Sequence, residues 1–174
     1  MKSVSDGRGG RRDPEEIPPI LSGTMVTSDL ARARRFYEDF LGLECVQPEP
    51  GKLLLRDKRA ADLMRRGERG GIVIEVKEVV EIRHPQQRGH HWGFDAESTE
   101  EVDRMRSVAL ANDKIYGLKK IMPTTRSHGS YQFYFSDSDD NWWEIQYLGR
   151  SNENVFEDGD FKPAEESAMA QEVS

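Results

Sequence analysis

Residues 29–43 of the chain read DLARARRFYEDFLGL, the pattern of one amphipathic helix. Asp29 is a good N-cap residue, because its carboxylate can accept a hydrogen bond from a backbone N–H of the first turn. Gly42 suits the residue that follows a helix. Between them the apolar residues recur at helical spacing and form one stripe, made of Leu30, Ala33, Phe36, Tyr37, Phe40 and Leu41. The segment therefore predicts a helix that buries one side against a core.

A second helix is predicted to begin at Ser98, with Glu101 placed three residues later to complete a capping box. Its apolar stripe is formed by Val102, Met105, Val108 and Ala109, with Ala111 at its end. Short alternating runs around the two helices predict strands: Leu21–Thr27, Leu43–Gln47, Leu53–Arg56, Ile72–Lys77, His91–Ala96, Ile115–Ile121, Tyr131–Ser136 and Asn141–Tyr147. The order of one strand, one helix and three strands occurs twice. The sequence thus predicts two copies of a βαβββ unit.

The two copies share a fixed offset of 69 residues. The residues that cap the two predicted helices are 69 apart, from 29 to 98. Glu75 and Glu144, each inside the last strand of its half, are also 69 apart. The same offset places Ser22 on His91, in the strands that precede the two helices. We therefore expect the halves to superpose with Ser22 on His91 and Glu75 on Glu144.

The part of the chain that can fold is residues 20–150, with one module at 20–80 and the other at 88–150. Residues 1–19 are rich in Gly, Arg and Pro, and residues 151–174 are acidic with few apolar side chains. Neither end can bury enough surface to offset the entropy of ordering it. We expect both to be disordered tails.

Composition excludes several classes of partner. The chain has 174 residues and a net charge of -7, with no stripe of Lys and Arg interleaved with aromatic residues, so nucleic acid is not expected. No run approaches the roughly 20 apolar residues of a membrane span. The N-terminal segment lacks the apolar centre of a secretory signal, and Cys45, the single cysteine, cannot form an internal disulfide. We expect a cytoplasmic protein that binds a small molecule.

Two segments resemble a known family. Residues 29–43 resemble the first helix of glyoxalase, bleomycin-resistance and extradiol dioxygenase domains, which form the vicinal oxygen chelate superfamily. Residues 133–145, FYFSDSDDNWWEI, resemble the closing hairpin of these domains. The resemblance implies an α+β fold in which two βαβββ modules form one open, cup-shaped mixed sheet, a half-barrel, with the helices outside. It also implies a homodimer, because a second chain often closes the cup in such folds.

Strand alternation indicates which side chains face the cup. If Glu144 faces inward, then its neighbours two residues away on the strand do so too. The same argument applies to Glu75 and His91 on their own strands. The predicted polar floor consists of Ser22, Glu75, His91, Tyr134, Glu144 and Gln146, with Thr24, Gln132 and Trp142 also turned inward.

One imidazole and two carboxylates are a suitable set for a divalent metal such as Fe, Mn, Ni or Zn. In the family the metal lies on four inward positions, in the first and last strands of each module. The resemblance carries these positions to Ser22, Glu75, His91 and Glu144. We expect Glu75, His91 and Glu144 to be ligands, with water completing the shell, because the neutral hydroxyl of Ser22 is a poor ligand.

The resemblance implies a metal-dependent lyase or isomerase, of glyoxalase or epimerase type, that acts on a small oxygenated molecule. Glu75 or Glu144 would leave the metal and act as the base, and Tyr134 would donate a hydrogen bond to the substrate. Side chains on the same face would contact the substrate: Ser22, Thr24, Trp142 and Gln146.

Two other functions remain open. An extradiol dioxygenase needs two His and one Glu, and Ser22 removes one of the two His unless His90 or His128 supplies it. A metal-free binding protein of the bleomycin-resistance type would instead sequester an aromatic ligand. Ser22 and the aromatic residues, Trp142 among them, favour this second alternative.

Overall fold

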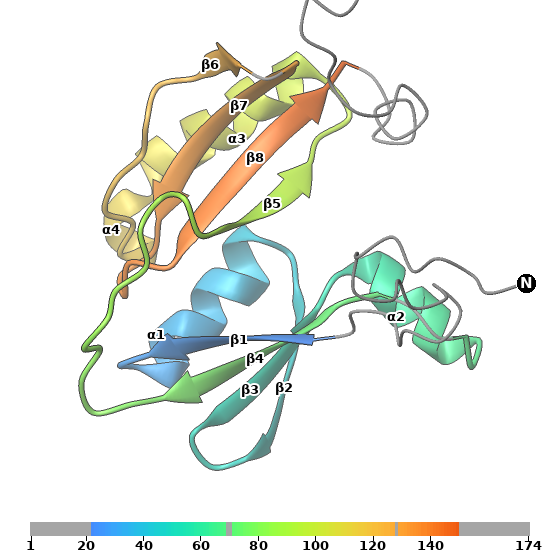
Figure 1. The fold of residues 1–174 in the computed structure, drawn as a ribbon, viewed down its shortest axis with the longest axis vertical. Helices are drawn as coiled ribbons and strands as arrows, with labels where there is room; N and C mark the ends of the chain where they lie inside the picture. The colour runs from blue at the N-terminus through green and yellow to red at the C-terminus, as the bar shows by residue number, and fades with distance from the viewer. Residues whose placement is uncertain (1–21, 69–70, 128, 150–174) are drawn as a thin grey trace, which may run out of the picture. The chain divides into compact units, whose positions relative to one another are not determined.

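The structure is a computed structural model that describes residues 22–68, 71–127 and 129–149. The two predicted tails, 1–19 and 151–174, lie outside the described residues, and so does His128. The described part divides into two compact units, with the boundary between Arg83 and His84. Each unit is a module with its own four-stranded mixed sheet (Figure 1). The predicted α+β class is confirmed, and neither sheet closes into a barrel.

The first module has the sheet order β1-β4-β3-β2, in which β1 and β4 are parallel and the other pairs antiparallel. Its strands are β1 Ser22–Thr27, β2 Glu44–Glu49, β3 Lys52–Arg56 and β4 Val73–Glu78. The predicted helix is confirmed as α1, Leu30–Arg35, which continues as a π-helical turn over Phe36–Phe40. The Asp29 carboxylate caps α1, accepting from the backbone N–H of Arg32 at 2.9 Å.

A helix that the sequence analysis did not predict, α2, spans Lys58–Arg65 between β3 and β4. Asp57 caps it by accepting from the backbone N–H of Ala60 at 2.6 Å. Only Ala60 and Ala61 of this helix are buried, so it lacks the broad apolar stripe by which helices are recognised in a sequence. α2 is a polar insertion on the edge of the module's core.

The second module has the sheet order β5-β8-β7-β6, again with one parallel pair, β5 and β8. Its strands are β5 His91–Asp95, β6 Thr125–Ser127, β7 Ser130–Ser136 and β8 Trp142–Leu148. The second predicted helix is confirmed as α3, Thr99–Ala111. Ser98 caps it as expected, but the Glu101 carboxylate accepts from the backbone N–H of Glu97, one residue before the cap.

The predicted strand Ile115–Ile121 is wrong. Residues 113–116 form a short helix, α4, which ends at Gly117 in the left-handed conformation with φ 67°. Leu118 then turns into the core, and the edge strand β6 begins only at Thr125. The apolar residues at 115, 118 and 121 are three residues apart, a spacing that alternation along a strand does not produce.

The predicted 69-residue offset is confirmed by the register of the parallel strands. Ser22 pairs with Val73 in the first module, and their equivalents His91 and Trp142 pair in the second. The third strands do not follow this offset. Glu75 pairs with Leu54, whereas Glu144 pairs with Tyr134. Leu54 and Tyr134 are 80 residues apart, not 69. The second module thus has 11 additional residues before β7. The first module has 11 additional residues between β3 and β4, and these contain α2, so the offset returns to 69 at the last strands.

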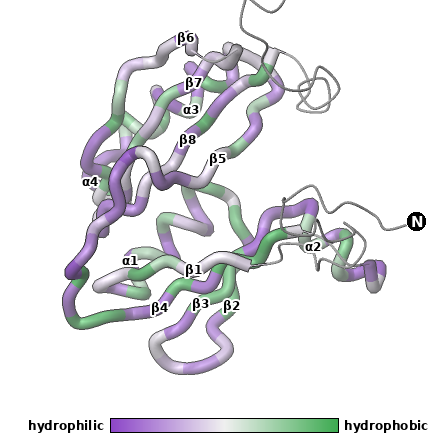
Figure 2. The backbone as a smooth tube through the Cα atoms, viewed as in Figure 1, coloured by the Kyte–Doolittle hydropathy of each residue, from purple (hydrophilic) through white to green (hydrophobic). Residues whose placement is uncertain are grey.

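In each module one face of the sheet packs on its helix and the other face is largely polar. Trp143, Phe133 and Phe135 are fully buried on the face covered by α3. Burial of each such side chain contributes about 1.5–3 kcal/mol. The segment between β4 and β5 is mostly hydrophilic in Figure 2, in keeping with its exposed residues. The polar faces are thus the places where function has to be sought.

Candidate functional site

The polar face of the second module is organised in rows across its strands. His91, Trp142 and Ser136 form one row, and Gly93, Glu144 and Tyr134 form the next. Asp95, Gln146 and Gln132 form a third. The predicted inward positions of this module therefore do share one face.

His91 and Glu144 form the centre of this face. The imidazole Nε2 of His91 lies 3.0 Å from Oε2 of Glu144. The Glu144 side chain is only 8% exposed and that of His91 is 27% exposed. The other imidazole nitrogen, Nδ1, lies 2.8 Å from the backbone carbonyl oxygen of Arg88. Both ring nitrogens are thus held by fixed partners.

These partners determine what the pair can hold. The Arg88 carbonyl can only accept, so Nδ1 carries a proton. In a neutral imidazole Nε2 then presents a lone pair, and an ionised Glu144 also presents only lone pairs. Two acceptors at 3.0 Å need a cation between them, and both a proton and a metal ion meet that need. Two ligands of one metal, each about 2.1 Å from it at a right angle, are also about 3.0 Å apart.

Tyr134 lies beside this pair. Its ring meets the His91 ring edge to face, with centroids 5.0 Å apart, and its hydroxyl is hydrogen-bonded to the Glu144 carboxylate. Burial, and then the bond to Glu144, raise the pKa of Tyr134 to about 12. The Arg88 guanidinium lies over the ring at 5.6 Å. Tyr134 is therefore a phenol that keeps its proton and can donate it in a hydrogen bond.

Gln132 orients the Tyr134 hydroxyl. Its Nε2 donates to Tyr134 Oη at 3.2 Å and to Ser127 Oγ at 2.8 Å, and its Oε1 accepts from Ser130. Because the amide nitrogen is directed at the phenol oxygen, the phenol proton is left for Glu144. A network of hydrogen bonds therefore runs from Ser127 on β6, through Gln132 and Tyr134 on β7, to the Glu144 carboxylate on β8.

Gln146 and Trp142, the other predicted residues of this face, differ in burial and in their contacts. Gln146 is half-buried, and its Nε2 donates to Asp95 at 3.3 Å. Trp142 is only 6% exposed, and the Lys120 ammonium lies 5.4 Å from its ring centroid. A ligand that stacks on Trp142 would have to displace Lys120.

On the first module, Glu75 lies in a different environment from its counterpart. It is paired with Lys77 at 2.9 Å and with Lys52 at 3.0 Å. These two ammonium groups hold the pKa of Glu75 below its usual range, with the bond to Lys77 the larger cause. Thr24 lies directly opposite Glu75 on β1, and both Thr24 and Ser22 are exposed. Glu75 is therefore a carboxylate with two cationic neighbours.

The structure brings some of the predicted ligands together within a module. His91 and Glu144 meet in the second module, whereas Glu75 and Ser22 belong to the first. In the described part of either module, taken alone, no three His, Cys, Asp or Glu side chains are grouped as metal ligands would be.

The sequence did not show the contacts made by four residues near the candidate ligands: Arg88, Gln132, Lys52 and Lys77. The Arg88 carbonyl has no sequence signal, because any residue supplies one. Gln132 was predicted to turn inward, but nothing in the sequence linked it to Tyr134. Lys52 and Lys77 lie directly opposite each other on β3 and β4, and only the register shows that Glu75 is within reach of both.

A sequence model of the Glyoxalase/Bleomycin resistance protein/Dioxygenase superfamily matches residues 19–145, most of the chain. The protein therefore belongs to this superfamily, as the resemblance implied. Curated protein sequences give no match. Among the described residues, no helix has the length and apolar character needed to span a membrane.

Solved structures with the same fold include three that are informative. A lactoylglutathione lyase from Agrobacterium tumefaciens is 22% identical, with a TM-score of 0.51, over 75% of this chain and 95% of that one. A mutant of the fosfomycin resistance protein FosX from Listeria monocytogenes, complexed with Mn(II) and 1S,2S-dihydroxypropylphosphonic acid, is 18% identical, with a TM-score of 0.53, over 75% and 90%. A glyoxalase/dioxygenase from Nostoc punctiforme is 16% identical, with a TM-score of 0.58, over 82% and 99%.

Proposed function

We propose that the protein is a metal-dependent vicinal oxygen chelate enzyme, a lyase or isomerase that acts on a small oxygenated organic molecule. The observation that carries the proposal is the His91–Glu144 pair, with Nε2 and Oε2 3.0 Å apart and Nδ1 fixed by the Arg88 carbonyl. A backbone carbonyl is one of the groups, with carboxylates and water, that commonly accept from the second nitrogen of a histidine that binds a metal.

The residues fit a divalent ion of the Fe, Mn, Ni or Zn type. His91 would supply an imidazole nitrogen, and Glu144 a carboxylate oxygen, which together suit these metals. Glu75, at the repeat-equivalent position, would be the third ligand. When bound, such an ion would polarise the oxygens of the substrate and favour loss of a neighbouring proton.

The chain's own residues would then bind the substrate and move its proton. Glu75 would leave the metal and act as the base. Lys52 and Lys77 lower its pKa, which keeps the carboxylate ionised but makes it a weaker base. Tyr134, whose phenol stays protonated, would transfer its single hydrogen bond from the Glu144 carboxylate to a substrate oxygen. Side chains of the two polar faces would contact the rest of the substrate: Ser22, Thr24, Trp142 and Gln146.

Metal content tests the proposal most simply. The full chain, purified without chelator, should contain bound metal, and addition of Mn, Ni or Zn ions should raise its melting temperature. His91→Ala and Glu144→Gln should abolish that rise, whereas His84→Ala, in an exposed loop, should keep it. Of three panels of test substrates, hemithioacetals, epoxides and catechols, the metal-loaded protein should turn over members of the first or second. A metal-free protein whose melting temperature ignores all three ions would contradict the proposal.

Two observations favour the metal-free alternative, in which the protein sequesters an aromatic ligand. Ser22 is a poor ligand, and Glu75 already has two cationic partners. Turnover of catechols, and not of the other panels, would instead favour the dioxygenase, whose second His would have to come from a residue such as His90. Ligand binding that is unaffected by EDTA would favour the metal-free function.

A further inference from the structure

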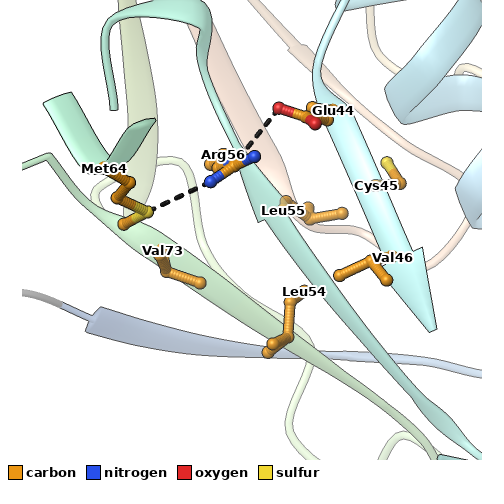
Figure 3. A pocket seen from close by; sticks show the side chains of 8 residues that line it. All are labelled: Glu44, Cys45, Val46, Leu54, Leu55, Arg56, Met64 and Val73. Carbon is orange, nitrogen blue, oxygen red and sulfur yellow. Dashed lines mark hydrogen bonds and ion pairs between the residues drawn. The ribbon is translucent and has the colours of Figure 1, made fainter. Parts of the chain in front are cut away.

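The polar face of the first module contains a cavity of about 460 Å³ on its β2 side. Its apolar lining includes Val46, Leu54, Met64 and Val73, and its charged lining is Glu44 and Arg56. Figure 3 shows Arg56 between Glu44 and Met64, with Val73 on the side of Met64 and Val46 on the other side of Leu54. This volume falls in the range of about 300–1,000 Å³ that small-molecule sites occupy.

The cavity exists because α2 breaks the symmetry of the two modules. Val46 and Leu54 are direct partners on β2 and β3, on the face that also bears Glu75. Met64 of α2 forms the opposite wall, and the second module has only a short turn in place of this helix. Val46 is 56% exposed and Met64 37%, so apolar surface remains accessible here.

The α2 wall is firmly attached. Besides the Asp57 cap, the backbone at Gly71 passes so close to Ala60 that a Cβ built on Gly71 would lie 2.4 Å from the Ala60 Cβ. Such close packing leaves α2 little room to shift towards the segment that leads into β4. The cavity is therefore formed before any ligand arrives, which lowers the cost of binding.

The polar side of the cavity offers one oriented guanidinium. Arg56 and Glu44 are direct cross-strand partners, with Nε 2.9 Å from Oε2. A second donor, Nη1 of Arg56, lies 3.3 Å from the Met64 sulfur. A thioether is a weak acceptor, so an anionic oxygen in its place would make a stronger, charge-assisted bond. The nearby Arg65 is shared between Glu44 and Asp62.

We propose that this cavity binds a compact, largely apolar organic molecule that carries one carboxylate, with the carboxylate on Arg56. A single guanidinium lines the cavity, and its planar fork matches a carboxylate. Apart from Glu44, which is paired with Arg56, the remaining lining residues are uncharged, and burial raises the pKa of the Cys45 thiol to about 12, so that it too is neutral. The site goes beyond the proposed function, since His91, Tyr134 and Glu144 do not line it.

The test uses the full chain with methyl-labelled methionine, titrated with 3-phenylpropionate and with its neutral analogue 3-phenylpropanol. The Met64 methyl signal, assigned with Met64→Leu, should shift with the acid and saturate. The alcohol should bind about tenfold more weakly, the size of one charge-assisted hydrogen bond. Arg56→Gln should bring the two affinities together, whereas Arg59→Gln, an exposed position on α2, should leave both unchanged.

Leu54→Trp should fill the cavity and abolish both titrations, because Leu54 is half-buried on the open face of β3. If circular dichroism shows that this variant is misfolded, Val46→Trp replaces it. A Met64 signal that does not respond to the acid would overturn the proposal, and so would equal binding of acid and alcohol by the unmodified chain. Metal uptake by His91 and Glu144, measured on the same samples, separates this failure from failure of the proposed function.

Discussion

Two glutamates that are equivalent in the repeat have acquired different partners. Glu144 is buried against His91 and Tyr134, whereas Glu75 lies between Lys52 and Lys77. The first arrangement holds an imidazole and a carboxylate at ligand spacing, and the second keeps a carboxylate ionised beside two ammonium groups. The proposed function uses both carboxylates as metal ligands and gives Glu75 the additional role of base.

The phenol of Tyr134 gives a first prediction. Burial and the Glu144 carboxylate raise the pKa of Tyr134 to about 12. In the metal-free protein its ring signal, assigned with Tyr134→Phe, should therefore stay constant from about pH 9 to about pH 11, whereas an ordinary tyrosine titrates near 10. Glu144→Gln should move the pKa down, so that titration begins inside this window. Carbon NMR of labelled tyrosine measures both, and titration of Tyr134 near 10 in the unmodified chain would contradict the account.

Asp137 gives a prediction about stability. Burial raises the pKa of this carboxyl from 3.8 to about 6, although Asn141 and the backbone at Asp139 and Asn141 donate to it. A raised pKa means that the folded chain holds this proton more tightly than the unfolded chain. The contribution of Asp137 to stability is therefore greatest below about pH 4 and is lost as the pH rises to about 6.

The comparison with Asp137→Asn isolates this effect. Between about pH 4 and pH 7 the unmodified chain should lose on the order of 2–3 kcal/mol of unfolding free energy relative to the variant. Urea denaturation at each pH measures the difference. A difference that is constant with pH would mean that Asp137 titrates normally.

Much of the candidate site was visible in the sequence, because alternation along a strand fixes which residues share a face. The strand pattern alone was enough to predict that His91, Tyr134 and Glu144 share one face of their sheet. Their partners needed the register. Nothing in the sequence pairs Lys52 with Glu75, because this contact crosses from β3 to β4 and depends on their register. Gln132 and Tyr134 are neighbours on one face of β7, but the sequence does not show that the amide is directed at the phenol.

At the scale of elements, the modules differ most where α2 replaces a short turn. The sequence predicted both long helices, since each has a good cap and an apolar stripe. It missed α2, which buries only two alanines, and it misplaced a strand at 115–121, where Gly117 ends a short helix. Elements with a wide buried face can be recognised from a sequence, whereas small, mostly polar ones depend on local contacts.

The close approach of Gly71 to α2 yields a prediction with a matched control. Gly71→Ala should cost about 2–4 kcal/mol, because its φ of +78° strains any side chain and the new Cβ meets Ala60. Gly51→Ala has nearly the same φ, +76°, but no atom within 4 Å of the new Cβ, and should cost only about 1–2 kcal/mol. Urea denaturation compares the two variants. Equal costs would show that Gly71 does not pack against Ala60.

At the scale of the whole molecule, we predict a homodimer. Apolar side chains such as Val46, Leu110 and Ile115 are exposed in the chain considered alone, and exposed apolar surface favours association. Light scattering on the full chain should give twice the chain mass of 19.9 kDa. A mass of 19.9 kDa at micromolar concentration would contradict the dimer.

The central claim is that His91 and Glu144 hold a divalent metal. Anomalous diffraction from crystals soaked with zinc tests it most directly. The account predicts one strong peak about 2.0–2.2 Å from His91 Nε2 and from a Glu144 carboxylate oxygen, with Nδ1 still on the Arg88 carbonyl. Crystals that show no peak there, and in which Nε2 and Oε2 remain hydrogen-bonded at 3.0 Å, would contradict it.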